Sequence, residues 1–265
     1  MSRHAYPSDL SDAQWAKLKE YIPSPKEGPQ ESKYERREVV NAMLYQKRTG
    51  CQWRFLPHDF PPWSLVKNYY YQWRGDGTFE RALDALRSRI RIESGREEDP
   101  SLGIIDSQSV KTTEVGGPSG FDAGKKVKGR KRHLLVDILG LLVVVIVTVA
   151  NVQDRDGLPS VLREAKATSS RLVNVLVDGA YNGKVVEQAS VDTGVKVTMV
   201  KRPDIKGFAV VPKRWIVERS FGWLNRERRL SKDYERTFAS SETWIRLSFI
   251  HQIVRRLAPQ KSRSC

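Results

Sequence analysis

Two short apolar runs that each end in an aspartate constrain the fold of this chain more than any other feature. The run at 102–105 leads into Asp106, and the run at 173–177 leads into Asp178. A short apolar run that breaks to polar residues is typical of a buried strand. A carboxylate at the end of such a strand costs free energy unless a charged group meets it. For either aspartate alone, a side-chain cap of the following turn is the simpler interpretation.

The chain after residue 100 alternates between strand and helix patterns. Strands are predicted over 102–106, 133–138, 142–150, 171–177 and 195–200. Helices are predicted over 154–168, 181–192, 213–229 and 241–257. The order βββαβαβα indicates an antiparallel meander followed by parallel crossovers. We therefore expect an α/β fold with an RNase H-like mixed five-stranded sheet, in which Asp106 ends the first strand, Asp178 ends the fourth, and the two are neighbours.

Residues 1–98 are predicted as an all-α, helix-turn-helix-like domain, and residues 99–265 as the domain that contains the sheet. The first helix carries a capping-box pattern at Ser11 and Gln14, and further helices are predicted over 35–49, 63–74 and 78–93. The helix over 63–74 is basic and aromatic, which is typical of contact with DNA. The candidates for this contact are Lys67, Asn68, Tyr70, Tyr71 and Arg74. Packing in the core is the alternative interpretation of the aromatic residues.

A third acidic residue, Glu218, lies in the predicted helix 213–229, whose apolar face contains Ile216 and Phe221. Two strand-end aspartates and one helix-borne glutamate offer the oxygen ligands that hard divalent cations prefer. Mg²⁺ keeps part of its water shell, so a few carboxylates and a substrate phosphate suffice to bind it. We expect Asp106, Asp178 and Glu218 to hold such an ion together.

The charge of the chain is strongly positive and unevenly distributed. The net charge is +15, and residues 101–265 contain 29 Lys and Arg against 16 Asp and Glu. The positive field therefore surrounds the predicted carboxylates. An acidic centre in such a field indicates a polyanionic partner, and nucleic acid is the obvious one.

A basic segment precedes the second predicted strand, inside a glycine- and lysine-rich excursion over 112–132. It carries six cations in eight positions, Lys125, Lys126, Lys128, Arg130, Lys131 and Arg132. We expect these side chains to contact the DNA backbone, because phosphate contacts dominate the affinity of such proteins. A solvated loop is the alternative. His133 and Asp137 are expected to be structural, Asp154 to cap a helix, and Asp122 to be a minor candidate for a metal ligand.

Other classes of protein are disfavoured by composition. No apolar run reaches the roughly 18 residues that a membrane helix needs, and the N-terminus lacks the apolar centre of a secretory signal. Cys51 and Cys265 form no metal-binding or disulfide pattern. These features predict a cytoplasmic protein that does not bind membranes.

Taken together, several segments resemble the DDE-type bacterial insertion-sequence transposases, in particular the insertion-sequence family numbered five. They are IIDSQSVK at 104–111, KGRKRHLLVDILGLL at 128–142, NVQDRDG at 151–157, LVDGAY at 176–181 and RWIVERSFGWLNRERRLSKDYE at 214–235. The resemblance implies that Asp106, Asp178 and Glu218 are the catalytic triad. It also implies that the N-terminal helices bind the terminal inverted repeats of the element. Synapsis of two ends implies at least a dimer, in a bacterial cytoplasm and close to the nucleoid.

The helix around Glu218 departs from the pattern of related families. Those families carry a Tyr and a Lys where this chain has Val211 and Asn225, whereas Arg214 and Glu218 fit. Arg226 lies one residue after the position at which those families carry the Lys that contacts phosphate. Two other arginines of this helix, Arg219 and Arg229, are alternatives for that role.

Three carboxylates that hold two Mg²⁺ ions, with Mn²⁺ as an expected substitute, can clamp a phosphodiester from both sides. Such a site can hydrolyse a DNA strand and then transfer the freed 3′-OH end into target DNA. Two rival functions remain. The first is a catalytically inactive DNA-binding protein, such as a decayed transposase, and the second is an RNase H-like nuclease. Metal-dependent cleavage separates the first rival from a transposase, and joining to a second DNA separates the second.

Overall fold

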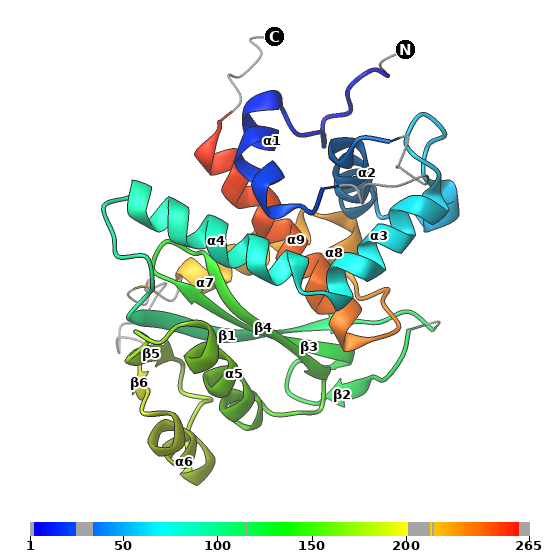
Figure 1. The fold of residues 1–265 in the computed structure, drawn as a ribbon. Coiled ribbons are helices and arrows are strands. Elements are labelled where there is room, and N and C mark those ends of the chain that lie inside the picture. Colours follow the sequence, from blue (N-terminus) through cyan, green and yellow to red (C-terminus); the bar gives the residue numbers. More distant parts are fainter. Residues whose placement is uncertain (1–2, 25–33, 115, 201–212, 214, 260–265) are drawn as a thin grey trace.

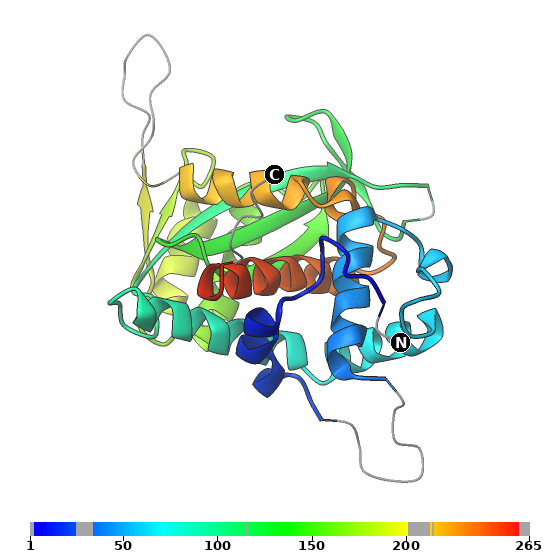
Figure 2. The ribbon, with the colours of Figure 1, turned by 90° about the horizontal axis from the view of Figure 1, so that it is seen from above.

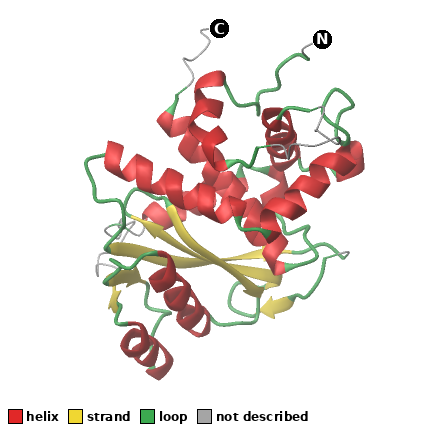
Figure 3. Cartoon of the chain, viewed as in Figure 1, coloured by secondary structure: helices red, strands yellow, loops and turns green. Residues whose placement is uncertain are grey.

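A computed structural model of the protein describes residues 3–24, 34–114, 116–200, 213 and 215–259. Its elements form a mixed sheet between two layers of helices (Figure 1 and Figure 3). Two of the predicted segments, the loop over 201–212 and the arginine at position 214, lie outside the described residues. The α/β class and the RNase H-like order of elements are confirmed.

Four α-helices precede the sheet. They are α1 (Asp12–Leu18), α2 (Arg36–Thr49), α3 (Trp63–Gly75) and α4 (Thr78–Glu93), with short 3-10 turns η1 (Lys19–Tyr21) and η2 (Trp53–Phe55). The predicted capping box is present, because Ser11 and Gln14 exchange side-chain and backbone hydrogen bonds. Residues 50–62 join α2 to α3, and this connection is far longer than the turn of three or four residues in a helix-turn-helix.

The sheet contains the five predicted strands and one short additional strand. The strands are β1 (Leu102–Lys111), β2 (Gly120–Asp122), β3 (Val127–Asp137), β4 (Leu142–Val149), β5 (Asn174–Val177) and β6 (Lys196–Met199). Their order is β2-β3-β1-β5-β6, and β4 also pairs with β3. The pairs β1–β3 and β3–β4 are antiparallel, whereas β1–β5 and β5–β6 are parallel. A meander followed by parallel crossovers is therefore what the chain forms.

Two boundaries differ from the sequence-based expectation. β1 continues beyond Asp106 to Lys111, so this aspartate lies within the strand rather than at its end. β3 begins at Val127, so most of the basic segment is strand rather than loop. Both strands gain length by pairing with each other over nine residues, from Gly103 opposite Asp137 to Lys111 opposite Gly129.

The two faces of the sheet carry separate apolar cores. Ile105 and Leu135 face α5 (Asp154–Thr168) and α6 (Lys184–Thr193), while Ile104 and Leu134 face the opposite layer. That opposite layer contains α4, α7 (Trp215–Asn225), α8 (Arg228–Ser231) and α9 (Phe238–Leu257), as Figures 1 and 2 show. None of the helices in the described ranges is both long and apolar enough to span a membrane.

The N-terminal helices and the C-terminal helix share one core. A single apolar cluster on the α7–α9 side contains residues from both parts of the chain, from Leu10 in the N-terminal part to Val254 in α9. α9 packs against α1, α2 and α4, and the hydroxyl of Tyr70 donates to the carbonyl of Ser240 at 3.0 Å. The boundary near residue 98 marks the passage of the chain from helices to sheet, and its status as a domain boundary stays a prediction.

Candidate active site

The pairing of β1 with β5 brings two acidic positions to the same level of the sheet. The strands are parallel neighbours, and Ile104 lies opposite Leu176 in their register. Continued by two residues, the same register places Asp106 opposite Asp178. The Asp106 carboxylate accepts a hydrogen bond from the Ser107 amide at 2.7 Å, and the Asp178 carboxylate accepts one from the Ala180 amide at 2.9 Å. The two aspartates are thus brought to neighbouring strands, as the sequence predicts.

Both positions belong to the face of the sheet that α7 covers. Side chains alternate between faces along a strand, so Asp106 follows Ile104, whose side chain is in the core under α7 and α9. Leu176 packs against the same core, and Asp178 is the next position on its face. Each aspartate is partly exposed. The pair therefore lies where the apolar core ends and solvent begins.

Tyr181 lies near enough to both aspartates for their charges to act on its hydroxyl. Its side chain is buried, with 1% of its surface exposed. Burial raises the pKa of the Tyr181 hydroxyl well above the usual value, and the charges of Asp106, Asp154 and Asp178 raise it further. The hydroxyl therefore stays protonated and lies within electrostatic reach of both predicted metal ligands.

Glu218 lies on the exposed side of α7. The helix buries Ile216, Val217 and Phe221 against the sheet, and it exposes a stripe that includes Glu218 and Asn225. α7 packs directly against β1 and β3. At the end of the stripe, the side-chain amide of Gln108 on β1, two residues beyond Asp106, lies 3.5 Å from the Asn225 oxygen.

The three carboxylates share one face of the sheet, but they are not gathered around a common centre. Among the residues that the structure describes, no group of three or more His, Cys, Asp or Glu side chains is placed to hold a metal ion. The donor chemistry fits a hard divalent cation, because all three groups are carboxylates, and Asp106 lies in β1 while Asp178 directly follows the adjacent strand β5. Their roles as metal ligands and catalytic residues stay a prediction.

A polar network that sequence reasoning missed lies on the other face of β1. The hydroxyl of Ser107 donates to Asp154 at 2.7 Å, and the Lys131 ammonium lies 2.8 Å from the same carboxylate. Lys131 also pairs with Asp122 at 3.2 Å, which accepts from Ser109 at 2.6 Å. Burial alone would raise the pKa of Asp122, but these hydrogen bonds and the Lys131 charge lower it to about 2. Asp122 and Asp154 are therefore ion-paired with lysine.

Asp154 is not the helix cap that its sequence position suggests. The N-cap of α5 is Gln153, and Asp154 is the first residue of the helix. Asp137 and His133 are structural, as expected. Asp137 is fully buried, forms an ion pair with Arg91 and accepts hydrogen bonds from two amides of the β3–β4 turn. His133 is fully buried too, and burial lowers its pKa to about 4.

The basic segment is divided between the interior and the surface. Arg130 and Arg132 are fully buried, and Lys131 is 4% exposed. Arg130 pairs with Asp233 at 3.1 Å, and Arg132 donates to the carbonyl of Leu230 at 2.8 Å. These three cations hold the protein together, so the prediction that they contact DNA is wrong for this structure. The three exposed members of the segment, which stay candidates, are Lys125, Lys126 and Lys128.

The arginines near Glu218 differ in their surroundings. Arg219 lies between the rings of Trp215 and Trp223, with its guanidinium carbon 4.6 Å from each ring centre. Arg226 is exposed. Arg229 is turned inward, where it pairs with Glu235 at 2.6 Å. Arg219 and Arg226 stay candidates for contact with phosphate, whereas Arg229 is occupied by its own carboxylate partner.

The outer surface of α3 carries the cations that the sequence predicts for contact with DNA. Lys67 and Arg74 are half-buried and Asn68 is exposed. Tyr70 is a core residue with 1% exposure, whereas Tyr71 is 41% exposed. The core interpretation thus holds for Tyr70, which removes it from the candidates.

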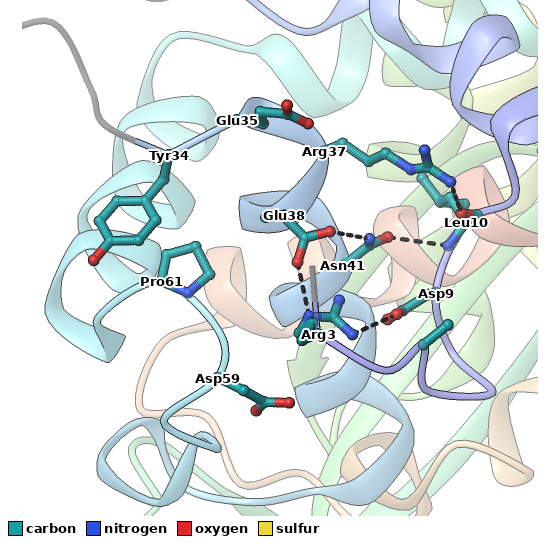
Figure 4. Close-up of a pocket in the computed structure, with 11 residues that line it drawn as sticks. Arg3, Asp9, Leu10, Tyr34, Glu35, Arg37, Glu38, Asn41, Asp59 and Pro61 are labelled. Carbon is teal, nitrogen blue, oxygen red and sulfur yellow. Dashed lines mark hydrogen bonds and ion pairs between the residues drawn. The ribbon is translucent and has the colours of Figure 1, made fainter. Parts of the chain in front are cut away.

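One cavity on the N-terminal helices is separate from these groups. It measures about 440 Å³ and lies beside the start of α2 (Figure 4). Arg3 pairs there with Asp9 at 2.7 Å and with Glu38 at 2.8 Å, and Asn41 joins Glu38 to the backbone of Leu10. These five lining residues bind one another, and none of the predicted site residues lines the cavity.

The order and pairing of the strands define an RNase H-like fold. Two family models match the chain. One, described as "Transposase DDE domain", covers residues 97–252, and the other, described as "Putative transposase of IS4/5 family", covers residues 10–83. The protein belongs to the transposase DDE family and is a DDE-type transposase. Members of this family use divalent metal ions.

Individual relatives support the same family. The "Putative transposase for insertion sequence element IS402" of Burkholderia cepacia is 30% identical over 140 residues, which are 50% of this chain and 65% of that protein. The match therefore spans slightly less than two thirds of that relative. The "Uncharacterized protein y4sN" of Sinorhizobium fredii (strain NBRC 101917 / NGR234) is 29% identical over 102 residues, 38% of this chain and 75% of that protein.

Two solved structures show a distant similarity to this chain. The Mos1 mariner paired end complex with Mn is 12% identical, covers 92% of this chain and 83% of that chain, and has a TM-score of 0.29. The Mos1 strand transfer complex is 13% identical, and the match covers 88% of this chain and 79% of that chain. Its TM-score is 0.28. At scores this low, neither similarity carries weight for the function of this chain.

Proposed function

We propose that this transposase binds the terminal inverted repeats of its element, cleaves DNA strands by metal-dependent hydrolysis and transfers the 3′-OH ends into target DNA. The observation that supports the proposal is the parallel pairing of β1 with β5, in which Ile104, two residues before Asp106, lies opposite Leu176, two residues before Asp178. The helix of Glu218 packs against β1 as well. A DDE family member needs three carboxylates at one place, and we propose that these three come together there when metal ions and DNA are bound.

The metal ions in this proposal are two Mg²⁺, with Mn²⁺ as a substitute. Asp106, Asp178 and Glu218 would hold them through carboxylate oxygens. When bound, such ions supply an activated water and offset charge on the leaving oxygen. Asp106 lies within β1 and Asp178 directly follows the neighbouring strand β5, and a scaffold of strands can fix charged groups in advance of a reaction.

The proposed surface for the terminal repeat is a row of alternating cations and aromatic rings on α3 and η2. Arg54 lies 5.6 Å from the centre of the Trp63 ring, and the Lys67 ammonium lies 6.0 Å from that ring and 5.7 Å from Tyr71. Arg74 stacks over Tyr71 at 4.7 Å. In the described part of the chain, none of these three cations forms an ion pair with a carboxylate. Cations held in a row without acidic partners suit the phosphates of a duplex.

A second proposed contact is the turn between β2 and β3. Lys125, Lys126 and Lys128 are exposed there. The Lys125 ammonium also donates to the carbonyl of Ser107 at 3.1 Å, which places a cation one residue from Asp106. A strand held for cleavage at Asp106 would pass close to this turn. We propose that these lysines, with Arg219 and Arg226 of α7, hold phosphates near the acidic centre.

We further propose that the active species is at least a dimer, since two ends must be joined to one target. The expected location is the bacterial cytoplasm, in association with the nucleoid. Both statements rest on the family and on the positive charge of the chain rather than on a surface in the structure.

The test is cleavage of a labelled duplex that contains the element end, in the presence of Mg²⁺ or Mn²⁺. We expect nicked product and joined product with the wild-type protein, and loss of both by roughly 10³-fold or more in Asp106→Asn, Asp178→Asn or Glu218→Gln, because each change removes a charge that holds the metal. DNA binding without metal should persist in all three. Glu187→Gln on α6, an exposed acidic residue on the opposite face, is the matched control.

The outcomes distinguish the proposal from its rivals. Binding without cleavage under any divalent ion would identify a DNA-binding protein without catalytic activity. Cleavage that never gives a joined product would identify a nuclease. Full joining by any one of the three variants would show that the triad is misassigned.

A further inference from the structure

The C-terminal turn of α2 is clamped to the joint between α7 and α8. The guanidinium of Arg48 donates to the carbonyl of Arg226 at 3.0 Å, and Arg229 donates back to the carbonyl of Cys51 at 3.3 Å. Gly50, between them, has a positive φ of 75°. A Cβ at this glycine would lie 3.3 Å from the Cβ of Arg228, so the two backbones approach closely.

A buried lysine lies at the centre of this clamp. The side chain of Lys47 is 1% exposed, and its ammonium lies 3.0 Å from the carboxylate of Glu227 and 3.1 Å from Nδ1 of His251. Burial lowers the pKa of Lys47, and the charge of Glu227 acts in the opposite direction. Buried ion pairs often contribute no more stability than apolar side chains of the same volume. A lysine here is therefore better explained by the precise connection it makes than by stability alone.

The clamp has a direct mechanical connection to Glu218. Glu227 follows α7 without an intervening loop: its amide donates to Leu224 of the last helical turn at 3.0 Å, and it is the N-cap of α8. Glu218 lies on the same helix, and a helix moves as a rigid rod over such a distance. The contact that fixes the end of α7 against α2 therefore also fixes the position of Glu218 relative to β1.

We propose that Lys47 and Glu227 are positioning residues that set where Glu218 stands relative to Asp106 and Asp178. The inference rests on the proposed function, since it assumes that these three carboxylates share metal ions. It adds a connection that the acidic centre alone does not show, because α2 packs on α3, the helix proposed to bind the terminal repeat. The same contact thus joins the DNA-binding helices to the helix of Glu218.

The test compares Lys47→Met, Glu227→Gln and the double variant with the wild type. Lys47→Met alone leaves the largely buried Glu227 carboxylate with the Arg48 guanidinium at 3.8 Å as its remaining ion-pair partner among the described residues, and it should lower stability. The double variant removes both charges and should recover that stability. We expect the rate of DNA cleavage to fall roughly tenfold or more in Lys47→Met and in the double variant, because small displacements of a catalytic group have such effects. The concentration of Mn²⁺ that half-saturates the protein–DNA complex, measured by electron paramagnetic resonance, should rise in both. The affinity for end DNA without metal should not change.

Two further variants keep the test decisive. Arg48→Met removes the contact to Arg226 from a half-exposed side chain, so it should fold normally and show the same shifts at smaller size. Arg89→Met removes a partly exposed arginine that pairs with Glu20 and Glu93 rather than with a member of the clamp, and it should match the wild type. A folded double variant with wild-type cleavage and wild-type Mn²⁺ binding would overturn the inference. A wild type that binds Mn²⁺ but never cleaves would instead overturn the proposed function.

Discussion

Asp137 connects three parts of the chain through one buried carboxylate. It forms an ion pair with Arg91 of α4, and it accepts hydrogen bonds from the amides of Leu139 and Leu141 at 2.9 Å each. Arg91 in turn donates to two carbonyls of the segment that leads into β1, those of Glu97 and Glu98. A single ion pair therefore fixes the β3–β4 turn and the entry to the central strand.

We predict that Asp137→Asn lowers the free energy of unfolding by about 3 kcal/mol, because it leaves the Arg91 guanidinium buried beside a neutral group. Equilibrium unfolding in urea measures this change. Glu97→Gln is the control, since the Glu97 side chain is 76% exposed and its pair with Arg171 should be worth less than about 1 kcal/mol. Equal effects of the two substitutions would show that burial of the ion pair does not matter.

At the scale of elements, α3 concentrates charge on one surface. Its inner side supplies Tyr70 and Trp73 to the core, while its outer side holds Lys67 and Arg74 against Tyr71. Cation–π contacts of this kind stabilise each pair by about 0.5–1 kcal/mol at exposed sites. Their main consequence here is that the cations are held along one helix surface before DNA arrives.

We predict that Lys67→Met and Arg74→Met each weaken binding of the terminal repeat and of unrelated duplex alike, because contacts to phosphate carry no sequence information. The slope of log affinity against log salt should fall by about one for each substitution. Fluorescence anisotropy at several salt concentrations measures both quantities. Lys184→Met on α6, on the other side of the sheet, should leave the slope unchanged. Loss of affinity for the repeat alone would instead indicate base readout by α3.

The sequence predicts most elements because apolar periodicity marks them locally, and β5 and α5 lie close to their expected bounds. The start of β3 could not be predicted in this way. Arg130 and Arg132 have the charge of a surface loop, and the partners that permit their burial, Asp233 and the carbonyl of Leu230, lie 103 and 98 residues further along the chain. The candidate site likewise combines a part that local patterns predict with a part that depends on distant packing. The strand order brings Asp106 and Asp178 together, whereas the position of Glu218 depends on packing that no local pattern encodes.

At the scale of the whole molecule, the sheet is enclosed by layers drawn from both ends of the chain. α4 from the N-terminal part and α9 from the C-terminal part cover β4 together. The apolar residues of these helices, such as Leu86 and Phe249, are nearly fully buried in the shared core. The core on the α7–α9 side is therefore complete only when both parts of the chain are present.

We predict that residues 99–265 expressed alone do not form a stable folded protein, because removal of α1–α4 exposes the apolar surfaces of α9 and β4 to water. Size-exclusion chromatography and a thermal melt measure this, with the full chain as the reference. The expected result is aggregation or the absence of a cooperative transition. A monomeric fragment with a sharp melt would show that residue 98 is a boundary between independently stable domains.

The place of α9 in this arrangement has a consequence during synthesis. The helix begins at Phe238 and packs against α1, α2 and α4, so the ribosome must synthesise the chain through α9 before these three helices can bury the apolar sides that face it. Because a nascent chain grows by about 5–20 residues per second, the apolar sides of those helices that face α9 stay exposed to water for many seconds. Products of premature termination should therefore be degraded instead of occupying the ends of the element as inactive competitors.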